Sequence, residues 1–388
     1  MDTLMETSQL PFTRAEYETR VDNVRKQMMK KNIDVLLVRE PINLYYLTGY
    51  NTIGFSNYTV LFLPLEGVPC MLVRSMEKMV ATTSTWLNDI VTWEDHENPY
   101  IRTKQELETH GWLKKEIAFE NSTTYMSIEG YSSLCNAVGR KLIDGSFLVE
   151  PVREIKSQQE IAYMRKAGDF TFASVDAGVK ALKAGVSENY VASQMYQAIV
   201  QDGGEYTSGE PILTCGKKSG IPHTTFHRYV LQEGDAALIE LSGVYNRYVC
   251  PTMRCAVIGP KFNPEIKVMA DVCIEALNKA IDAIRPGVTS GEVDEACRGV
   301  IERAGYYENF RKRTGYSIGS SYPPTWVENM IDLKKDDPRM LKPGMVFHLP
   351  VALRKYGEFG VGLSESVLVT ETGHEVISRV PRKLFIVH

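Results

Sequence analysis

Three residues of the chain have the chemistry needed to hydrolyse a C–N bond: one histidine and two glutamates. His223 follows Pro222 in a polar, glycine-rich loop just before a predicted strand, where a side chain can be directed into a cleft. Glu240 interrupts the apolar run 236–243, and Glu365 interrupts the similar run 363–369. Because burying an unpaired carboxylate is unfavourable, Glu240 requires a partner or a function. A histidine with two carboxylates suffices for acid–base or nucleophilic catalysis.

Structural roles are the alternatives for these residues. A lone loop histidine is more often structural or solvated than catalytic. Glu240 has Arg254 and Arg247 as candidate partners in a buried ion pair. Period-two alternation along the strands is compatible with both glutamates facing one seam, which would favour a shared site.

Aromatic and histidine side chains supply candidates for the pocket wall. Tyr316 lies between Gly315 and Gly319, and glycines let a backbone approach a ligand closely. Trp326 ends the rigid segment 322–326, which forms either a pocket wall or a surface turn. His348 stands in another strand-rich segment. The chain has no Walker loop or dinucleotide fingerprint, so no phosphate cofactor is expected.

The elements that position these residues indicate two domains. Residues 1–151 alternate a predicted helix (14–31) with short apolar runs (33–38, 60–64, 70–73 and 115–119), which is typical of an α/β layer. A capping box at Ser157 to Glu160 begins a long helix with Ile161, Met164 and Phe172 on its apolar side. We therefore expect a second domain over 152–388.

The second domain contains an internal repeat. Residues 182–187 followed by a helix resemble residues 284–289 followed by a helix, and residues 231–235 resemble 341–345 before a strand. The alternative is that Gly-Val-Ser/Thr is only a common helix start. Two similar halves predict a pseudo-two-fold α+β domain with its cleft at the seam.

Composition excludes several classes of protein. The 388 residues carry 44 Lys and Arg against 48 Asp and Glu, and this net charge of −4 argues against a nucleic-acid binder. No apolar stretch of signal-peptide or membrane-spanning length occurs, so we expect a cytoplasmic protein with no membrane partner. The seven cysteines form no Cys-x-x-Cys pair, which favours free thiols.

The assembled motifs resemble the pita-bread superfamily of methionine aminopeptidase, prolidase, aminopeptidase P and creatinase. The resemblance rests on residues 43–50, 154–167, 222–223 and 341–345 and spans nearly the full length. It implies a small N-terminal α/β domain, a C-terminal pita-bread domain and a homodimer. Most peptidases of that superfamily bind two metal ions through aspartates, a histidine and glutamates. The corresponding positions here hold Glu240, Pro251, Tyr316, Pro350 and Ser364, so we expect no metal and no other cofactor.

Within the superfamily the chain is most similar to ectoine hydrolases. Creatinase binds the guanidinium group of its substrate through two glutamates, and the corresponding positions here hold Met253 and Ser364. The ectoine hydrolase pattern is instead matched at Glu240, 247–248, 250–251, 313–319, 322–324, Trp326, 347–348, 365–366 and 380–385. Ile53, Val249 and Gly362 depart from that pattern, which puts the identity of the substrate in doubt.

We therefore expect a metal-independent hydrolase of a small cyclic amidine or amide zwitterion. His223 would move the proton, Glu240 would attack or direct water, and Glu365 would stabilise the amidinium charge. The substrate-binding residues would be Tyr316, Trp326, His348, Phe55 and Arg254. The alternatives are a creatinase-like amidinohydrolase, a metal-dependent Xaa-Pro peptidase and a non-catalytic metabolite binder.

Overall fold

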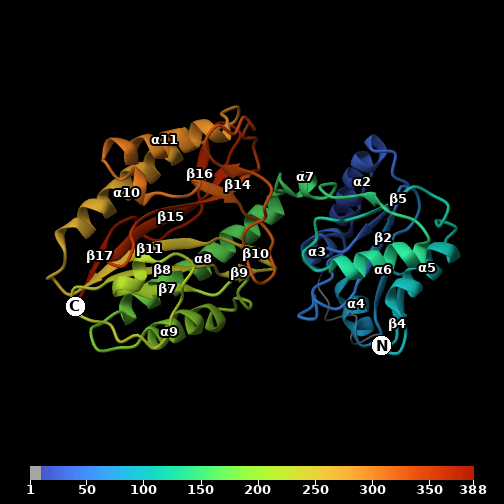
Figure 1. Cartoon of the computed structure of the whole chain (residues 1–388), viewed down its shortest axis with the longest axis horizontal. Helices are drawn as coiled ribbons and strands as arrows, with labels where there is room; N and C mark the ends of the chain where they lie inside the picture. The colour runs from blue at the N-terminus through green and yellow to red at the C-terminus, as the bar shows by residue number, and fades with distance from the viewer. Residues whose placement is uncertain (1–9) are drawn as a thin grey trace. The chain divides into compact units, whose positions relative to one another are not determined.

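The computed structural model describes residues 10–388 and divides the chain into two compact units (Figure 1). The first unit ends at Arg153 and the second begins at Glu154. Among residues 10–388 there is no helix long and apolar enough to cross a membrane.

The N-terminal unit is built on a mixed six-stranded sheet in the order β4-β3-β2-β1-β5-β6. All four residues of β1 are buried, and apolar clusters cover both faces of the sheet. An α/β layer, as the alternation of helix and apolar runs predicted, is thus confirmed. Its strands are β1 (Val35–Val38), β2 (Val60–Pro64), β3 (Cys70–Arg74), β4 (Ile90–Trp93), β5 (Ile117–Phe119) and β6 (Ile143–Asp144). Its helices are α2 (Arg14–Lys30), α3 (Pro41–Thr48), α4 (Lys78–Ser84), α5 (Pro99–Thr109), α6 (Ile128–Val138) and α7 (Glu150–Arg153), with the 3-10 turn η1 (Ser75–Glu77).

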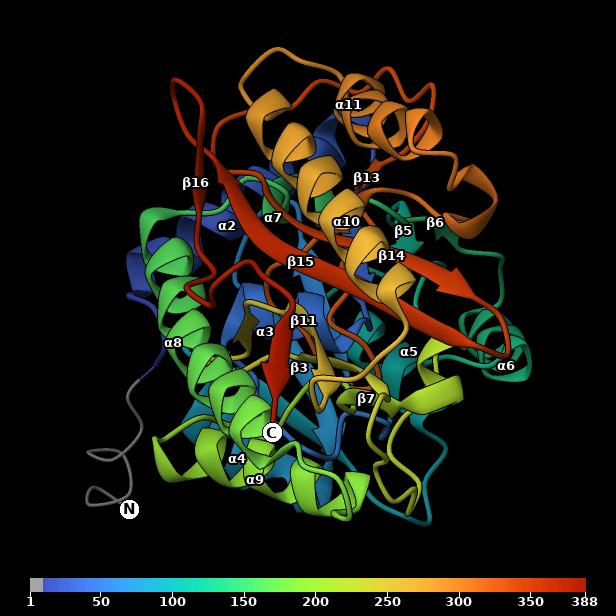
Figure 2. The ribbon, with the colours of Figure 1, turned by 90° about the vertical axis from the view of Figure 1, so that its left-hand side faces the viewer.

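The second unit has two larger sheets with long helices against them (Figure 2). One sheet has the order β17-β11-β8-β7 and the other β13-β12-β14-β15-β16. The strands are β7 (Ile212–Cys215), β8 (Ala236–Leu241), β11 (Thr252–Ile258), β12 (Gly315–Ser317), β13 (Asp332–Leu333), β14 (Val346–Lys355), β15 (Phe359–Val369), β16 (His374–Val376) and β17 (Phe385–Val387), with the β9 (Val244–Tyr245) and β10 (Tyr248–Val249) ribbon. The helices are α8 (Gln158–Ala181), α9 (Glu188–Gln201), α10 (Pro264–Ala283) and α11 (Ser290–Arg303), with the 3-10 turns η2 (Gly216–Gly220) and η3 (Tyr307–Asn309).

The predicted capping box begins α8. The Ser157 side chain accepts the N–H of Glu160, and the Glu160 carboxylate accepts the N–H of Ser157. Ile161 and Met164 are buried as expected, but Phe172 is 40% exposed. That expectation was wrong because Phe172 lies roughly 20° around the helix beyond Ile161, which is already at the edge of the buried stripe.

The internal repeat is confirmed by matching contacts in the two halves. Ser187 caps α9 and bridges to Val230, while Thr289 caps α11 and bridges to Met340. The N–H of Gly185 donates to the Leu231 carbonyl at 2.9 Å, and the N–H of Gly287 donates to the Leu341 carbonyl at 3.0 Å. Both glycines have φ near +85°, at 87° and 84°, a conformation in which a Cβ is unfavourable. Each half therefore begins its second helix with the same turn and joins it to the segment before its main strand.

Candidate active site

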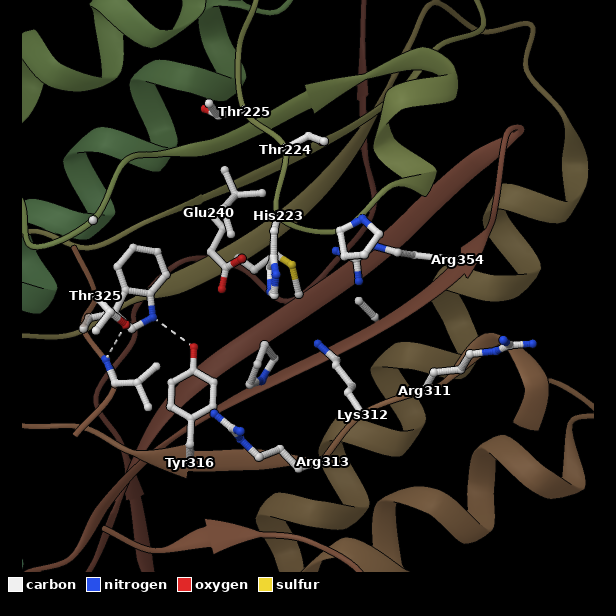
Figure 3. A pocket seen from close by; sticks show the side chains of 18 of the residues that line it. His223, Thr224, Thr225, Glu240, Arg311, Lys312, Arg313, Tyr316, Thr325 and Arg354 are labelled. Carbon is white, nitrogen blue, oxygen red and sulfur yellow. Dashed lines mark hydrogen bonds between the residues drawn. The ribbon is translucent and has the colours of Figure 1, made fainter. Parts of the chain in front are cut away.

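A cavity of about 900 Å³ lies in the second unit, and residues of both half-repeats line it (Figure 3). β8 contributes Glu240 and β11 contributes Met253, which is paired with Glu240 in the sheet. β14 contributes Pro350, Ala352 and Arg354, which alternate along the strand and so face the same side. The pocket thus lies at the seam between the halves, where the sequence predicted the cleft.

Glu240 is a buried carboxylate that opens on this pocket. Glu240 is 5% exposed, and its Oε1 atom lies 3.8 Å from Nε2 of His348. Within residues 10–388 the carboxylate accepts no hydrogen bond from a protein donor. Burial raises the pKa of Glu240, and the cations Lys312 and Arg354 oppose that rise. The expected partners are engaged elsewhere, since Arg254 binds Glu365 and Arg247 binds Glu205.

Two cations face Glu240 across the cavity, and sequence reasoning did not single them out. Figure 3 shows Lys312 and Arg354 reaching toward the space in front of Glu240, while Arg311 points away from it. Burial, followed by the charge of Arg354, lowers the pKa of Lys312 to about 8. Burial also lowers the pKa of Arg354, and Glu240 opposes that effect. The Arg354 Nε atom is buried and has no hydrogen-bond partner among residues 10–388.

A chain of hydrogen bonds connects the pocket wall to its interior. Trp326 Nε1–H donates to the Tyr316 hydroxyl at 2.9 Å, and His348 Nδ1 lies 2.9 Å from the same oxygen. Because an indole N–H only donates, Tyr316 accepts it and can give its own proton to His348 Nδ1. His348 Nε2 then donates to Ser364 Oγ at 2.6 Å. Burial lowers the pKa of His348 well below its usual value, which favours this neutral ring.

The predicted aromatic residues divide between the pocket wall and the layer beneath it. Tyr316 and Trp326 line the cavity, and Gly209 leaves room for the indole because a Cβ there would lie 2.9 Å from it. The segment with Trp326 is therefore a pocket wall rather than a surface turn. His348 is fully buried and reaches the cavity through Tyr316 and Glu240.

His223 lies at the exposed side of the cavity. It lines the pocket with Pro222 and Thr224, and Figure 3 shows its side chain extending into the pocket in the same region as Glu240. Its backbone φ of 56° is in the left-handed region, where a non-glycine residue carries strain. An exposed imidazole at the pocket edge has access to both solvent and a bound molecule.

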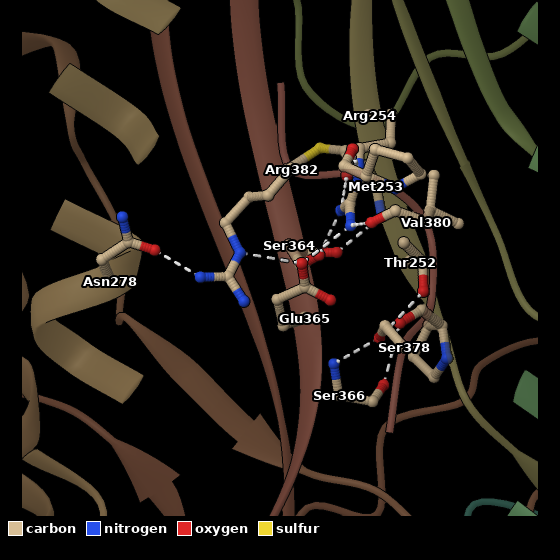
Figure 4. A network of polar contacts seen from close by, with 12 residues as sticks. Thr252, Met253, Arg254, Asn278, Ser364, Glu365, Ser366, Ser378, Val380 and Arg382 are labelled. Carbon is tan, nitrogen blue, oxygen red and sulfur yellow. Dashed lines mark hydrogen bonds and ion pairs between the residues drawn. The ribbon is translucent and has the colours of Figure 1, made fainter. Parts of the chain in front are cut away.

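The structure places Glu365 and Arg254 outside the cavity, so their predicted roles there were wrong. Glu365 Oε1 accepts from Arg254 Nη2 at 2.7 Å and from Arg382 Nε at 3.0 Å (Figure 4). On β15, Ser364 faces the pocket side, so its neighbour Glu365 points to the opposite face, toward Arg382 and Asn278. The expectation that both glutamates face one seam was therefore wrong, because Glu365 lies one residue after the pocket-facing position on β15 and so points to the other face.

Phe55 and Ile53 belong to the N-terminal unit, whereas every pocket-lining residue lies between 209 and 356. The Phe55 ring packs edge-on against Tyr125, with centroids 5.6 Å apart. Ile53 is 81% exposed. The cavity is described within the second unit alone, so the predicted contact of Phe55 with substrate stays untested.

Gly362 and Val249 occupy closely packed positions. A Cβ at Gly362 would lie 2.7 Å from the Ala352 Cβ and 2.8 Å from the Met253 Cε. Val249 is fully buried in β10 and donates its N–H to the Gly319 carbonyl at 3.0 Å. The space for a larger polar side chain at residue 362 is taken by the pocket-lining methionine.

The donor atoms at the cavity do not fit a two-metal centre. Tyr316 and Ser364 bind His348 there, Pro350 has no side-chain ligand atom, and Glu240 is the single carboxylate among these positions. Within residues 10–388, one group of three or more His, Cys, Asp or Glu residues has its ligand atoms within 4.8 Å of one another. That group is Cys70, Asp89 and His110, in the N-terminal unit.

The fold and the cavity define a two-domain hydrolase of pita-bread architecture. Residues 162–371 match the model of metallopeptidase family M24, and residues 20–155 match the creatinase/prolidase N-terminal domain. The chain therefore belongs to family M24, and the predicted pita-bread fold is confirmed.

Similar proteins include an ectoine hydrolase and a dipeptidase. The chain is 30% identical to an ectoine hydrolase of Halomonas elongata, over 97% of this chain and 98% of the relative. It is 33% identical to an uncharacterized hydrolase/peptidase, y4tM, of Sinorhizobium fredii, over 97% and 99%. Among solved structures it resembles dipeptidase PepE from Mycobacterium ulcerans, with a TM-score of 0.82 and 25% identity over 97% of this chain and 99% of that one. The resemblance to ectoine hydrolase inferred from the motifs is thus confirmed.

Proposed function

We propose that the protein hydrolyses a C–N bond in a small cyclic amidine or amide zwitterion, similar in size to ectoine or 5-hydroxyectoine. The observation that carries this proposal is the position of Glu240, a buried carboxylate that faces a cavity without a hydrogen-bonded partner. A carboxylate kept in that state at the seam of the fold is suited to act on a bound molecule.

The proposed reaction needs only groups of this chain and water. Glu240 either directs water onto the electrophilic ring carbon, or attacks that carbon itself to form a covalent intermediate that water then hydrolyses, which frees Glu240. His223 takes a proton from the attacking water and passes it to the ring nitrogen as the C–N bond breaks. The carbon gains the water oxygen and the nitrogen gains a proton, so the ring opens to a single product that carries both the amide or acid and the free amine. Proton transfer of this kind contributes about a hundred- to ten-thousand-fold in rate.

Metal independence belongs to this proposal and rests on the donor chemistry. The residues at the family's ligand positions include two prolines, and the hydroxyls of Tyr316 and Ser364 are bound to His348. Such groups are poor ligands for the hard-oxygen sites used by dinuclear hydrolases.

Product analysis by mass spectrometry tests the proposal. Ectoine, hydroxyectoine, creatine and dipeptides ending in proline would be incubated separately with the protein and with its His223→Ala variant. The proposal predicts a product one water heavier from a cyclic amidine or amide, and a large loss of rate in the variant. Full turnover by His223→Ala would contradict the assigned proton transfer. Binding without any product on long incubation would favour a metabolite binder.

A metal-dependent dipeptidase is the second candidate, because the structural relatives include dipeptidases. It predicts cleavage of an Xaa-Pro dipeptide that stops when metal is chelated. Turnover of a cyclic amidine with no cleavage of the dipeptides would exclude it.

A homodimer, which the family resemblance implies, and a cytoplasmic location, which the lack of long apolar stretches predicts, remain proposals. Size-exclusion chromatography with light scattering tests the first directly. The predicted role of Phe55 would be supported if Phe55→Ala lowered the activity while the protein remained a folded dimer.

A further inference from the structure

Some of the charged side chains around the cavity have hydrogen-bond or ion-pair partners within the protein, and others do not. Arg313 Nε lies 3.1 Å from Asp332 Oδ1, and Arg311 Nη2 lies 3.4 Å from Glu308 Oε2. Glu210 accepts the hydroxyl proton of Tyr196. These side chains have partners within the protein.

Lys312 and Arg354 differ from that set. Both line the cavity, and among residues 10–388 neither side chain makes a hydrogen bond or an ion pair within 4.0 Å. The charges that act on Lys312 come from Arg354 on β14, Glu240 on β8, Cys273 on α10 and Cys297 on α11. Glu240 is the one carboxylate in that set, so two partly buried cations share a single negative charge that they do not contact.

We propose that Lys312 and Arg354 form the subsite for a carboxylate of the substrate, held opposite Glu240. This inference rests on the proposed hydrolase function and names its substrate class: a molecule that carries at least one carboxylate beside the C–N bond to be cut. A guanidinium and an ammonium that converge on one space bind a carboxylate through charge-assisted hydrogen bonds. The substrate anion supplies the partner that Lys312 Nζ and the terminal nitrogens of the Arg354 guanidinium lack in the protein.

The arrangement also gives the substrate one orientation. With its carboxylate at Lys312 and Arg354, a small ring has its opposite edge toward Glu240 (Figure 3). The wall made by Tyr316 and Trp326 then bounds the ring from another side. Positioning a ring against an attacking group in this way lowers the barrier by restricting its motion before reaction.

A rival explanation is that the two cations only keep Glu240 ionised. Under that explanation a ligand gains nothing from a carboxylate, and neutral and anionic ligands bind alike. The two explanations therefore differ in what they predict for a matched pair of ligands.

Isothermal titration calorimetry with two such pairs separates them. The pairs are 5-oxoproline with the neutral 2-pyrrolidone, and ectoine with ectoine amide, which keeps the amidinium charge; each pair compares a carboxylate probe with a counterpart that lacks the carboxylate. The full-length Glu240→Gln protein is titrated so that no probe is consumed. We expect each carboxylate to bind about tenfold or more tightly than its counterpart, because hydrogen bonds to charged groups are worth that much.

Variants assign the preference to particular side chains. Lys312→Met and Arg354→Met, each in the Glu240→Gln background, are expected to remove the preference for the carboxylate while affinity for the counterpart that lacks it stays within about twofold. Lys334→Met is the matched control, because Lys334 also lines the cavity but is exposed at its rim. Circular dichroism and thermal unfolding confirm that each variant is folded. If a variant does not fold, the probe pairs on the parent protein still decide the question.

Several outcomes would overturn the subsite. Equal affinity for the two members of a pair contradicts it, as does failure of every carboxylate probe to bind at millimolar concentration. An unchanged preference in both Met variants contradicts the assignment to Lys312 and Arg354. A clear carboxylate preference with no hydrolysis by the wild-type protein supports the subsite and overturns the proposed function instead, so the two failures are distinguishable.

Discussion

Glu240 and Glu365 are both buried glutamates on central strands of the same domain, yet their surroundings differ completely. Glu365 is 1% exposed and accepts from two arginines on the helix-facing side of its sheet. Glu240 is 5% exposed and accepts from none, with a cavity in front of it. The comparison separates a carboxylate that is neutralised within the protein from one that is held available to a ligand. Both glutamates are buried, so the distinction comes from the hydrogen-bond partners of each carboxylate and not from its burial.

The first test of this contrast is turnover. Glu240→Gln preserves shape and hydrogen-bonding capacity but removes the charge that attacks or directs water. We expect kcat to fall by about a hundredfold to ten-thousandfold with the fold intact. Steady-state kinetics on the substrate found in the product screen measures the effect. A Glu240→Gln protein that keeps full activity would remove the distinction between the two glutamates.

The second test is stability. Glu365→Leu leaves Arg254 buried without its counter-charge, and breaking a buried pair in this way costs about 3–5 kcal/mol of unfolding free energy. Urea denaturation measures the change. Glu375→Leu is the control, because the Arg165–Glu375 pair is partly exposed and such pairs are worth about 1 kcal/mol or less. If Glu365→Leu cost no more than the control, the ion pair of Glu365 would not be the structural element inferred here.

The third test concerns the hydrogen bonds that connect Trp326, Tyr316 and His348. Tyr316→Phe removes the hydroxyl that Trp326 donates to and that His348 Nδ1 contacts. Leaving such buried groups unsatisfied costs about 1–3 kcal/mol. Thermal unfolding should therefore show a lower midpoint, and fluorescence of Trp326 should change because its indole loses its partner. No change in either measurement would mean that the wall is held by other contacts.

The smallest expected effect is in the pH dependence of substrate binding. Burial and Arg354 lower the pKa of Lys312 to about 8, so its ammonium is charged below that pH and loses its proton above it. KM for a carboxylate substrate should therefore rise above about pH 8, while KM for a neutral analogue stays flat. Lys312→Arg should move the rise to higher pH because a guanidinium stays protonated. A KM that is constant up to pH 10 would contradict a substrate-binding Lys312 whose pKa is lowered to about 8.

The sequence was sufficient for the architecture because the relevant signals are local. The cap at Ser157, the glycine turns at 185 and 287 and the apolar runs of the N-terminal unit each depend on a few neighbouring residues. The internal repeat was predictable because a turn of the same sequence pattern precedes both α9 and α11.

The site was only partly predictable because it depends on which face of a strand each residue occupies. Glu240, His223, Tyr316 and Trp326 do line one cavity. Glu365 does not, because strand alternation turns it to the other face of β15. Arg354 carried a usable signal, since it stands at even spacing from Pro350 and so shares the pocket face. Lys312 carried none, because the charged groups that act on it lie on β8 and β14, which are distant from it in the sequence.

Metal content measured together with activity tests the central claim most directly. The protein would be treated with chelator, analysed for bound metal by inductively coupled plasma mass spectrometry, and assayed on the substrate found in the product screen. We predict full hydrolysis with far less than one metal ion per chain, and its loss in Glu240→Gln. Activity that disappears with the chelator and returns on adding manganese or zinc would show that a metal centre, rather than Glu240 acting with His223, performs the reaction.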